Sequence, residues 1–200
     1  LAAQLYAEFK SFFPKNAVEY FISYYDYYQP EAYVPQTDTY IEKDASINDH
    51  IDRLRLKCTS SLLSRKDVLV VASVSCIYNI GTPENYKSSS VRLEAGRAAS
   101  RTKLAGELVA IQYERNEVDF QRGRFRMKGS VLDVFPAYSE TAIRAEFEGD
   151  RIAKLSHLHP LTGANLGRLK DVWIYPAKHF ITTPPELERA LSVIESELAE

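Results

Sequence analysis

Aromatic side chains gather in one short stretch of this sequence. Seven of its 13 tyrosines fall within 21 consecutive positions. Nucleobases stack on exposed aromatic rings, and each stacked base contributes about 1–3 kcal/mol without sequence preference. One interpretation is therefore a nucleic-acid stacking surface. The other is a buried aromatic cluster, and the pattern alone favours neither. The seven residues are Tyr20, Tyr24, Tyr25, Tyr27, Tyr28, Tyr33 and Tyr40.

A run of basic residues forms a second candidate site. Five of them fall within 14 positions, namely Arg115, Arg122, Arg124, Arg126 and Lys128. Alternation puts Arg124, Arg126 and Lys128 on one strand face, and Arg144 and Glu146 share a face of a later strand. Such rows are usually solvated faces with cross-strand Arg–Glu pairs. The sharper interpretation is a surface for an acidic partner, because the guanidinium fork matches carboxylates and phosphates. Charge alone does not say whether that partner is protein or nucleic acid.

Residues that catalysis needs are sparse. The four histidines show no metal-binding spacing with Cys58 and Cys76, and the sequence contains no G-x-x-x-x-G-K-[ST] phosphate loop. We therefore predict no catalytic residue, no metal site and no self-contained nucleotide hydrolase. The net charge of −2 excludes a uniformly basic nucleic-acid coat but not a local patch. Two cysteines and no apolar run of about 18 residues predict a cytoplasmic location without a membrane.

The first 80 or so residues have the pattern of an α/β domain. Apolar residues at helical spacing predict a helix that ends at Pro14, and alternation predicts a strand at residues 17–23. Ser46 and Asp49 resemble a capping box at the start of a second helix. The β-branched run at residues 68–74 predicts a strand buried on both faces.

The tyrosine stretch interrupts this pattern. Pro30 and Pro35 forbid a helix or a central strand there, so a protruding hairpin or a long loop fits better. Polar neighbours such as Asp26 and Gln29 would be awkward inside a core.

A second unit follows a change in composition. Residues 81–90, with the sequence GTPENYKSSS, predict a turn-rich connector and a domain boundary. Beyond it we predict a short helix at residues 103–113 and alternating strands, among them residues 131–135, in a small α+β unit around an antiparallel sheet. Thr183 as a cap and Pro184 at the first helical position predict a C-terminal helix.

Five segments of the chain carry a family resemblance. They are the region around YYDYYQPEAYVP, then VVASVSCIYNIG, FQRGRFRMKGSVLDVFPA, PLTG and IYPAKHFIT. They resemble the UvrB family of bacterial nucleotide excision repair, and the resemblance covers essentially all 200 residues. The tyrosine motif is very specific to this family.

The resemblance implies a superfamily 2 helicase fold with P-loop, RecA-like lobes. Residues 1–88 would be part of one lobe, with a β-hairpin at about 23–45. Residues 89–180 would be a UvrA-interaction domain, and residues 181–200 a helix returning toward the motor domain. The family's phosphate loop precedes the matched segment and its Walker B motif follows it, so the chain resembles an internal fragment. ATP and Mg²⁺ would belong to the full-length helicase-like subunit, and we expect no cofactor and no ATPase activity in these residues alone.

The resemblance also implies residue roles. The hairpin would insert between DNA strands with Tyr24, Tyr25, Tyr27, Tyr28, Tyr33 and Tyr40. Arg55 would be a possible contact to the DNA backbone. The UvrA-binding residues would be Arg115, Arg126, Lys128, Arg144 and Glu146.

The implied function is DNA damage recognition and verification within the SOS response. Its partners would be damaged double-stranded DNA, UvrA, and UvrC, which acts at the later incision step. The alternative is a non-catalytic UvrA-binding module, as in the bacterial transcription-repair coupling factor. That factor is not expected to carry YYDYYQPEAYVP, so this motif favours the first interpretation.

Overall fold

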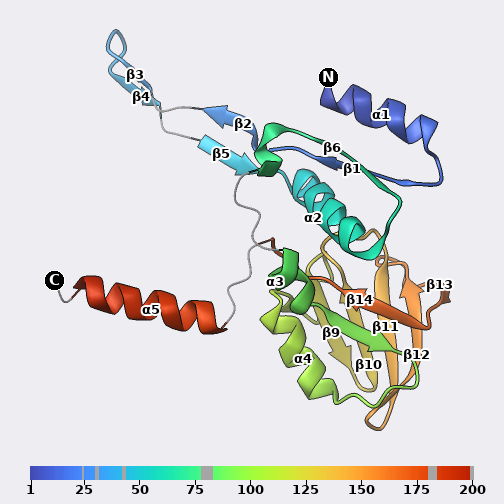
Figure 1. The fold of residues 1–200 in the computed structure, drawn as a ribbon. Coiled ribbons are helices and arrows are strands. Elements are labelled where there is room, and N and C mark those ends of the chain that lie inside the picture. Colours follow the sequence, from blue (N-terminus) through green and yellow to red (C-terminus); the bar gives the residue numbers. More distant parts are fainter. Residues whose placement is uncertain (24, 30–31, 42–43, 78–82, 180–183, 199–200) are drawn as a thin grey trace. The chain divides into compact units, whose positions relative to one another are not determined.

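The chain divides into two compact units, residues 1–79 and residues 80–200 (Figure 1). This computed structural model describes residues 1–23, 25–29, 32–41, 44–77, 83–179 and 184–198. The chain is mixed α/β with several separate sheets. The expected assignment of domains at 1–88, 89–180 and 181–200 stays a prediction.

A parallel strand pair forms the centre of the first unit. Strand β1 (Ala17–Phe21) pairs with β6 (Val68–Ala72), and Ala17 lies opposite Val68. Helices α1 (Ala2–Phe12) and α2 (Asp49–Ser64) both contact this pair. The two expected helices and two expected strands are confirmed.

The expected burial of β6 on both faces is wrong. Of its five residues only Val71 is buried, with 8% of its surface exposed, and β1 is its one neighbour among the described strands. A β-branched run indicates a strand but not how many of its faces are covered. Burial on both faces depends on neighbouring strands and helices, which the local pattern does not specify.

The start of α2 also differs from the expected capping box. The N-cap is Asn48, whose side-chain oxygen accepts hydrogen bonds from the backbone N–H groups of His50 and Ile51 at 2.9 and 3.3 Å. Ser46 lies instead in strand β5 (Asp44–Ile47). Asn is among the strongest N-cap residues, so it satisfies the first turn without Ser46.

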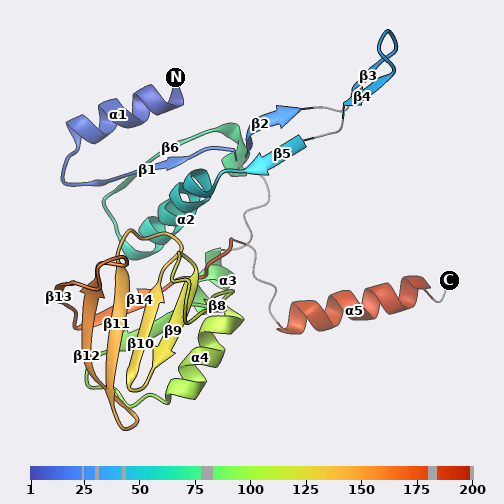
Figure 2. The same cartoon turned by 180° about the vertical axis from the view of Figure 1, so that it is seen from behind.

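The tyrosine stretch forms two antiparallel ladders, as expected for a hairpin (Figures 1 and 2). Strand β2 (Tyr25–Gln29) pairs with β5, and β3 (Ala32–Val34) pairs with β4 (Thr39–Ile41). The register between β2 and β5 shifts by one residue between Tyr25 and Tyr28. Such a bulge disturbs the simple alternation of side chains along a strand.

A six-stranded sheet forms most of the second unit, in the order β13-β12-β11-β10-β9-β8. All neighbours in it are antiparallel except β8 and β9. Glycine at positions 129 and 149 has positive φ in the two-residue turns after β9 and β11, as type II′ hairpins require. The strands are β8 (Glu114–Arg115), β9 (Arg124–Lys128), β10 (Val131–Phe135), β11 (Ala142–Glu148), β12 (Arg151–Leu158) and β13 (Asn165–Arg168).

One face of this sheet carries the core. Strand β7 (Val91–Glu94), its antiparallel partner β14 (Asp171–Ile174) and helix α4 (Arg101–Ala110) lie against it (Figure 2). Leu132 from the sheet and Leu108 from the helix are among its fully buried residues. The core therefore fixes which face of the sheet is left for polar residues.

The expected connector at residues 81–90 contains a helix that the sequence analysis missed. Helix α3 (Pro83–Ser88) begins with proline, a residue favoured at the first helical position. Tyr86 is 5% exposed, and its hydroxyl donates to the carbonyl of Pro176 at 3.1 Å. This hydrogen bond between residues far apart in the sequence therefore holds the helix against the rest of the second unit.

Two further helices among the described residues are a short one directly before this connector and a longer one near the C-terminus. These are the 3₁₀-helix η1 (Val74–Ile77) and α5 (Pro184–Leu198). The expected C-terminal helix is confirmed, whereas its predicted cap, Thr183, lies outside the described residues. Among the described helices, none has the length and apolarity needed to cross a bilayer.

Candidate functional site

The polar face of the six-stranded sheet brings charged residues of three strands into one row. Alternation along β9 puts Phe125 in the core and Arg126 on the polar face. The register then places Asp133 of β10 opposite Arg126, and Arg144 of β11 opposite Asp133. We call Arg126, Asp133 and Arg144 the charged row.

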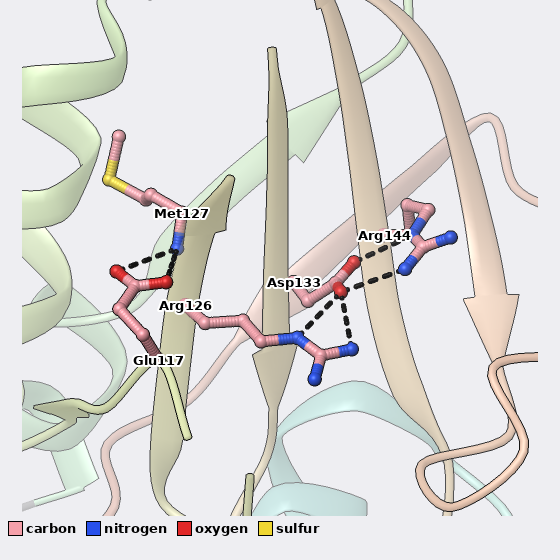
Figure 3. A network of polar contacts seen from close by, with 5 residues as sticks. All are labelled: Glu117, Arg126, Met127, Asp133 and Arg144. Carbon is pink, nitrogen blue, oxygen red and sulfur yellow. Dashed lines mark hydrogen bonds and ion pairs between the residues drawn. The ribbon is translucent and has the colours of Figure 1, made fainter. Parts of the chain in front are cut away.

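Both arginines of the charged row bind the same carboxylate (Figure 3). Arg126 approaches Oδ2 of Asp133 with Nε at 3.0 Å and Nη2 at 2.9 Å. Arg144 donates from Nε to Oδ1 at 2.7 Å and from Nη2 to Oδ2 at 2.9 Å. Asp133 is 3% exposed. A buried carboxylate requires this pairing, because an unpaired charge is costly inside a protein.

The charged row keeps a net positive charge, because two guanidinium groups share one carboxylate. The hydrogen bonds from Arg144 to Asp133 raise the pKa of that arginine further. Each guanidinium retains N–H donors that Asp133 does not use. The arginine side chains are 21% and 30% exposed, against 4% for Asp133. Arginine is therefore the group that this row offers to a partner.

The cross-strand Arg–Glu pair considered in the sequence analysis is not what holds Arg144. Its partner is Asp133, and Glu146 pairs instead with Lys154 of β12 at 3.7 Å. Asp133 was not among the predicted site residues. Its signal was an acidic residue in the middle of the otherwise apolar strand VLDVF.

Two further predicted contact residues lie beside the charged row. Lys128 on β9 and Glu146 on β11 both pair in register with Val131 of β10. Both therefore lie on the polar face. Lys128 is two residues beyond Arg126 along β9, and Glu146 is two residues beyond Arg144 along β11. The structure thus brings four of the five predicted UvrA-binding residues together on β9 and β11, the two strands that flank β10.

The fifth, Arg115, lies on the edge strand β8. Its Nε donates to Glu117 at 2.9 Å. Figure 3 shows the other contact of Glu117, whose two carboxylate oxygens accept from the backbone N–H of Met127 at 3.3 and 3.2 Å. The hydrogen bond from Arg115, followed by that from Met127, lowers the pKa of Glu117. Glu117 therefore accepts a hydrogen bond from the backbone N–H that β9 would otherwise leave unpaired at this edge. Its hydrogen bond with Arg115 holds that side chain in place.

Other members of the basic run are held within the unit. Arg122 lies over the ring of Phe135, with 5.5 Å from Cζ to the ring centroid, and donates from Nε to the carbonyl of Ser139 at 3.0 Å. Arg124 forms ion pairs with Asp119 and Glu114. These arginines are part of the surface but are engaged by neighbouring groups.

The tip of the hairpin exposes two of the predicted DNA-binding tyrosines. Tyr33 and Tyr40 pair in register, with 57% and 59% of their surface exposed. The hydroxyl of Tyr33 donates to Asp38 at 2.8 Å, which raises the pKa of the phenol. Neither ring belongs to a buried aromatic cluster.

The remaining hairpin tyrosines are described less fully. Tyr24 lies outside the described residues. For Tyr25, Tyr27 and Tyr28 the structure describes the path of strand β2, and their side chains lie outside the description. Their predicted roles stay predictions.

Arg55, the possible DNA-backbone contact, lies on α2 with 5% of its surface exposed. Its guanidinium stacks on Phe21, with 4.1 Å between Cζ and the ring centroid, and Nη1 donates to the carbonyl of Ile22. As placed, the group has little surface to offer to a phosphate. The predicted DNA contact stays a prediction.

Within the described ranges, no group of His, Cys, Asp and Glu side chains could hold a metal ion. A cavity of about 680 Å³ lies between α4 and β7, lined by Arg92, Leu104 and Trp173 among others. None of the predicted site residues lines this cavity. The charged row is therefore the best-defined candidate site.

Comparisons with known proteins place this site in a recognised domain. Residues 91–180 match the family described as the UvrB interaction domain. The chain is 59% identical to UvrABC system protein B of Lactobacillus johnsonii over 199 residues. It is 58% identical over 201 residues to the proteins of that name from Streptococcus equi subsp. zooepidemicus and Streptococcus pneumoniae.

These alignments cover 99–100% of the chain and 30% of the relatives' own length. The predicted family resemblance is therefore confirmed: along its whole length the chain is similar to part of UvrABC system protein B, and residues 91–180 match the UvrB interaction domain.

Proposed function

We propose that this chain is the part of a nucleotide excision repair protein that docks UvrA through its second unit. The observation that carries the proposal is the charged row, which lies inside the segment matched as the UvrB interaction domain. A net positive row with outward N–H donors suits an acidic protein surface. Arg115, Arg126, Lys128, Arg144 and Glu146 are the proposed contact residues.

The first unit has a separate role in this proposal. Its hairpin enters damaged double-stranded DNA, and the exposure of Tyr33 and Tyr40 supports a contact role over a buried aromatic cluster. The parallel β1–β6 pair with helices α1 and α2 supports a partial helicase lobe, since parallel strands joined through helices are typical of α/β motor domains. The six hairpin tyrosines and Arg55 are the proposed DNA contacts.

The complete activity belongs to the longer protein of which this segment is a part. There we propose damage verification in the cytoplasm as part of the SOS response, with ATP and Mg²⁺ bound outside these residues and with UvrC acting afterwards. A UvrA-binding module of a coupling factor remains the second candidate. Similarity over the whole chain, hairpin included, favours the first.

Binding of the 200-residue chain to UvrA tests the docking function. Arg126→Glu reverses the charge of the row, and we expect UvrA affinity to fall by at least about tenfold. Arg115→Gln removes the positive charge at the exposed edge without placing a new carboxylate beside Asp133 or Glu117, so it guards against misfolding. Lys103→Glu on α4, where the side chain is 79% exposed, is the matched control and should leave affinity within about twofold. Unchanged affinity of both arginine variants at low and high salt would refute docking through this face.

A further inference from the structure

Asp133 has no direct access to a partner, yet it is the most heavily bonded member of the charged row. Its side chain is 4% exposed and lies between two arginines on the neighbouring strands. Any effect that it has on recognition must therefore pass through Arg126 and Arg144. We infer that Asp133 is a positioning residue, which fixes these two arginines as a rigid pair of forks for two carboxylates of the partner. This inference rests on the proposed docking function.

The geometry of the bonds determines which donors remain. Nε and Nη2 of both arginines are directed at Asp133. Each arginine therefore keeps both N–H groups of Nη1 and the second N–H of Nη2, and these form the fork that a partner carboxylate can bind. Arg126 and Arg144 lie on strands separated by β10, which corresponds to about 10 Å across the sheet. The row therefore suits a partner surface that presents two carboxylates at about this spacing.

Preorganisation is the advantage of this arrangement. A long side chain loses conformational freedom when a partner immobilises it, and this loss weakens binding. In the charged row the freedom of both arginines is already restricted when the sheet forms. The entropy lost when the partner binds is therefore smaller. We expect this gain in affinity to appear mainly as slower dissociation and less as faster association.

A simple charge model makes the opposite prediction. Asp133 reduces the positive charge of the row, so its removal would strengthen attraction to an acidic partner if charge alone mattered. If Asp133 positions the arginines, its removal releases Arg144, leaves Arg126 with its contact to the ring of Phe120, 4.3 Å from its Cζ, and pushes two like charges apart. The sign of the change in affinity therefore separates the two explanations.

The test is Asp133→Asn in the 200-residue chain, with UvrA as the partner. We expect affinity to fall by about tenfold through faster dissociation, while association stays equal or becomes faster. Asp171→Asn is the matched control, because Asp171 pairs with Arg92 at 3.1 Å in the β7–β14 pair and gives the same change in net charge. The control should stay within about twofold of the parent chain. Affinity of a folded Asp133→Asn chain that is equal to or tighter than the parent's would overturn the inference.

Two further measurements apply if Asp133→Asn does not fold. Arg144→Lys keeps the charge but removes the fork, so we expect affinity to fall by about tenfold, and unchanged affinity would contradict the proposal. In the parent chain, the Nε–H signals of Arg126 and Arg144 should exchange slowly with water by NMR, and fast exchange of both would also contradict it. If Arg126→Glu weakens binding but Asp133→Asn does not, the docking function stands and only the positioning role fails.

Discussion

Arg144 binds Asp133 through two parallel hydrogen bonds, from Nε to Oδ1 at 2.7 Å and from Nη2 to Oδ2 at 2.9 Å. The two residues lie directly opposite each other on β11 and β10. A slip of one residue in this register would move one of them to the core face. Fold and recognition surface are therefore linked, because the strand register that buries the core also assembles the charged row.

Glu117→Gln tests how the edge of the sheet is braced. The pKa of Glu117 is lowered by Arg115 and then by the N–H of Met127, so its charged form stabilises the fold. That stabilisation is present above the ordinary glutamate pKa and is lost as the pH falls through the lowered value. We expect the variant to melt below the parent at neutral pH and at the same temperature in acid. Glu114→Gln, whose carboxylate is 76% exposed, is the control for loss of a surface charge. A difference in melting temperature that persists unchanged into acid would contradict this account.

Asn48→Ala tests the cap of α2. Removing the oxygen that accepts from His50 and Ile51 should lower the free energy of unfolding by about 1 kcal/mol. Ser46→Ala is the informative comparison, because the sequence pattern named Ser46 and the structure names Asn48. Chemical denaturation followed by circular dichroism measures both. A larger loss for Ser46→Ala than for Asn48→Ala would favour the capping box.

Local periodicity was sufficient to locate most elements. The alternation at residues 124–128 correctly separated Phe125 from Arg126, because a strand places successive side chains on opposite faces. Helix α3 was missed because six residues are too few to show a helical period. Which strands become neighbours depends on long-range pairing, and no local pattern encodes it.

The residues of the candidate site also divide into those that local spacing reveals and those that depend on long-range strand pairing. The arginines were found from their types and spacing, but Asp133 was not, because its role depends on the register of three strands. Arg55 follows Ile51 by four residues and precedes Cys58 by three, so it lies on the buried stripe of α2. That spacing was the available signal that its guanidinium would be packed inside the unit.

The two cysteines should differ sharply in reactivity. Burial, followed by the negative charge of Glu19, raises the pKa of the Cys58 thiol from 9.0 to about 12. Cys58 is 1% exposed, whereas Cys76 is half-buried. We expect a thiol reagent at pH 8 to modify Cys76 first and Cys58 only on unfolding, because the thiolate is the reactive form. Rapid modification of both thiols in the folded chain, compared with a Cys76→Ser control, would show that Cys58 is accessible.

The raised pKa of Cys58 also gives a stability prediction. A neutral thiol favoured by the folded state contributes stability below the ordinary cysteine pKa, and this contribution is lost as the pH rises toward 12. Alkaline pH should therefore destabilise the parent chain more steeply than Cys58→Ala, although the variant starts from a lower stability at pH 7. Parallel curves of unfolding free energy between pH 8 and 11 would contradict the predicted burial of a neutral thiol.

Tyr27→Ala combined with Tyr28→Ala tests the DNA role of the hairpin. The register shift in β2 between Tyr25 and Tyr28 disturbs simple alternation there, so both residues are changed together. If each ring stacks on a base at about 1–3 kcal/mol, damage-specific loading of the longer protein should fall by about tenfold or more. UvrA affinity should stay within about twofold, because the charged row lies in the other unit. Phe12→Ala removes another exposed ring, at 68% exposure on α1, and should leave loading unchanged. Unchanged loading of the double variant would favour a structural role for these tyrosines, whereas loss in both variants would indicate a general defect of the first unit.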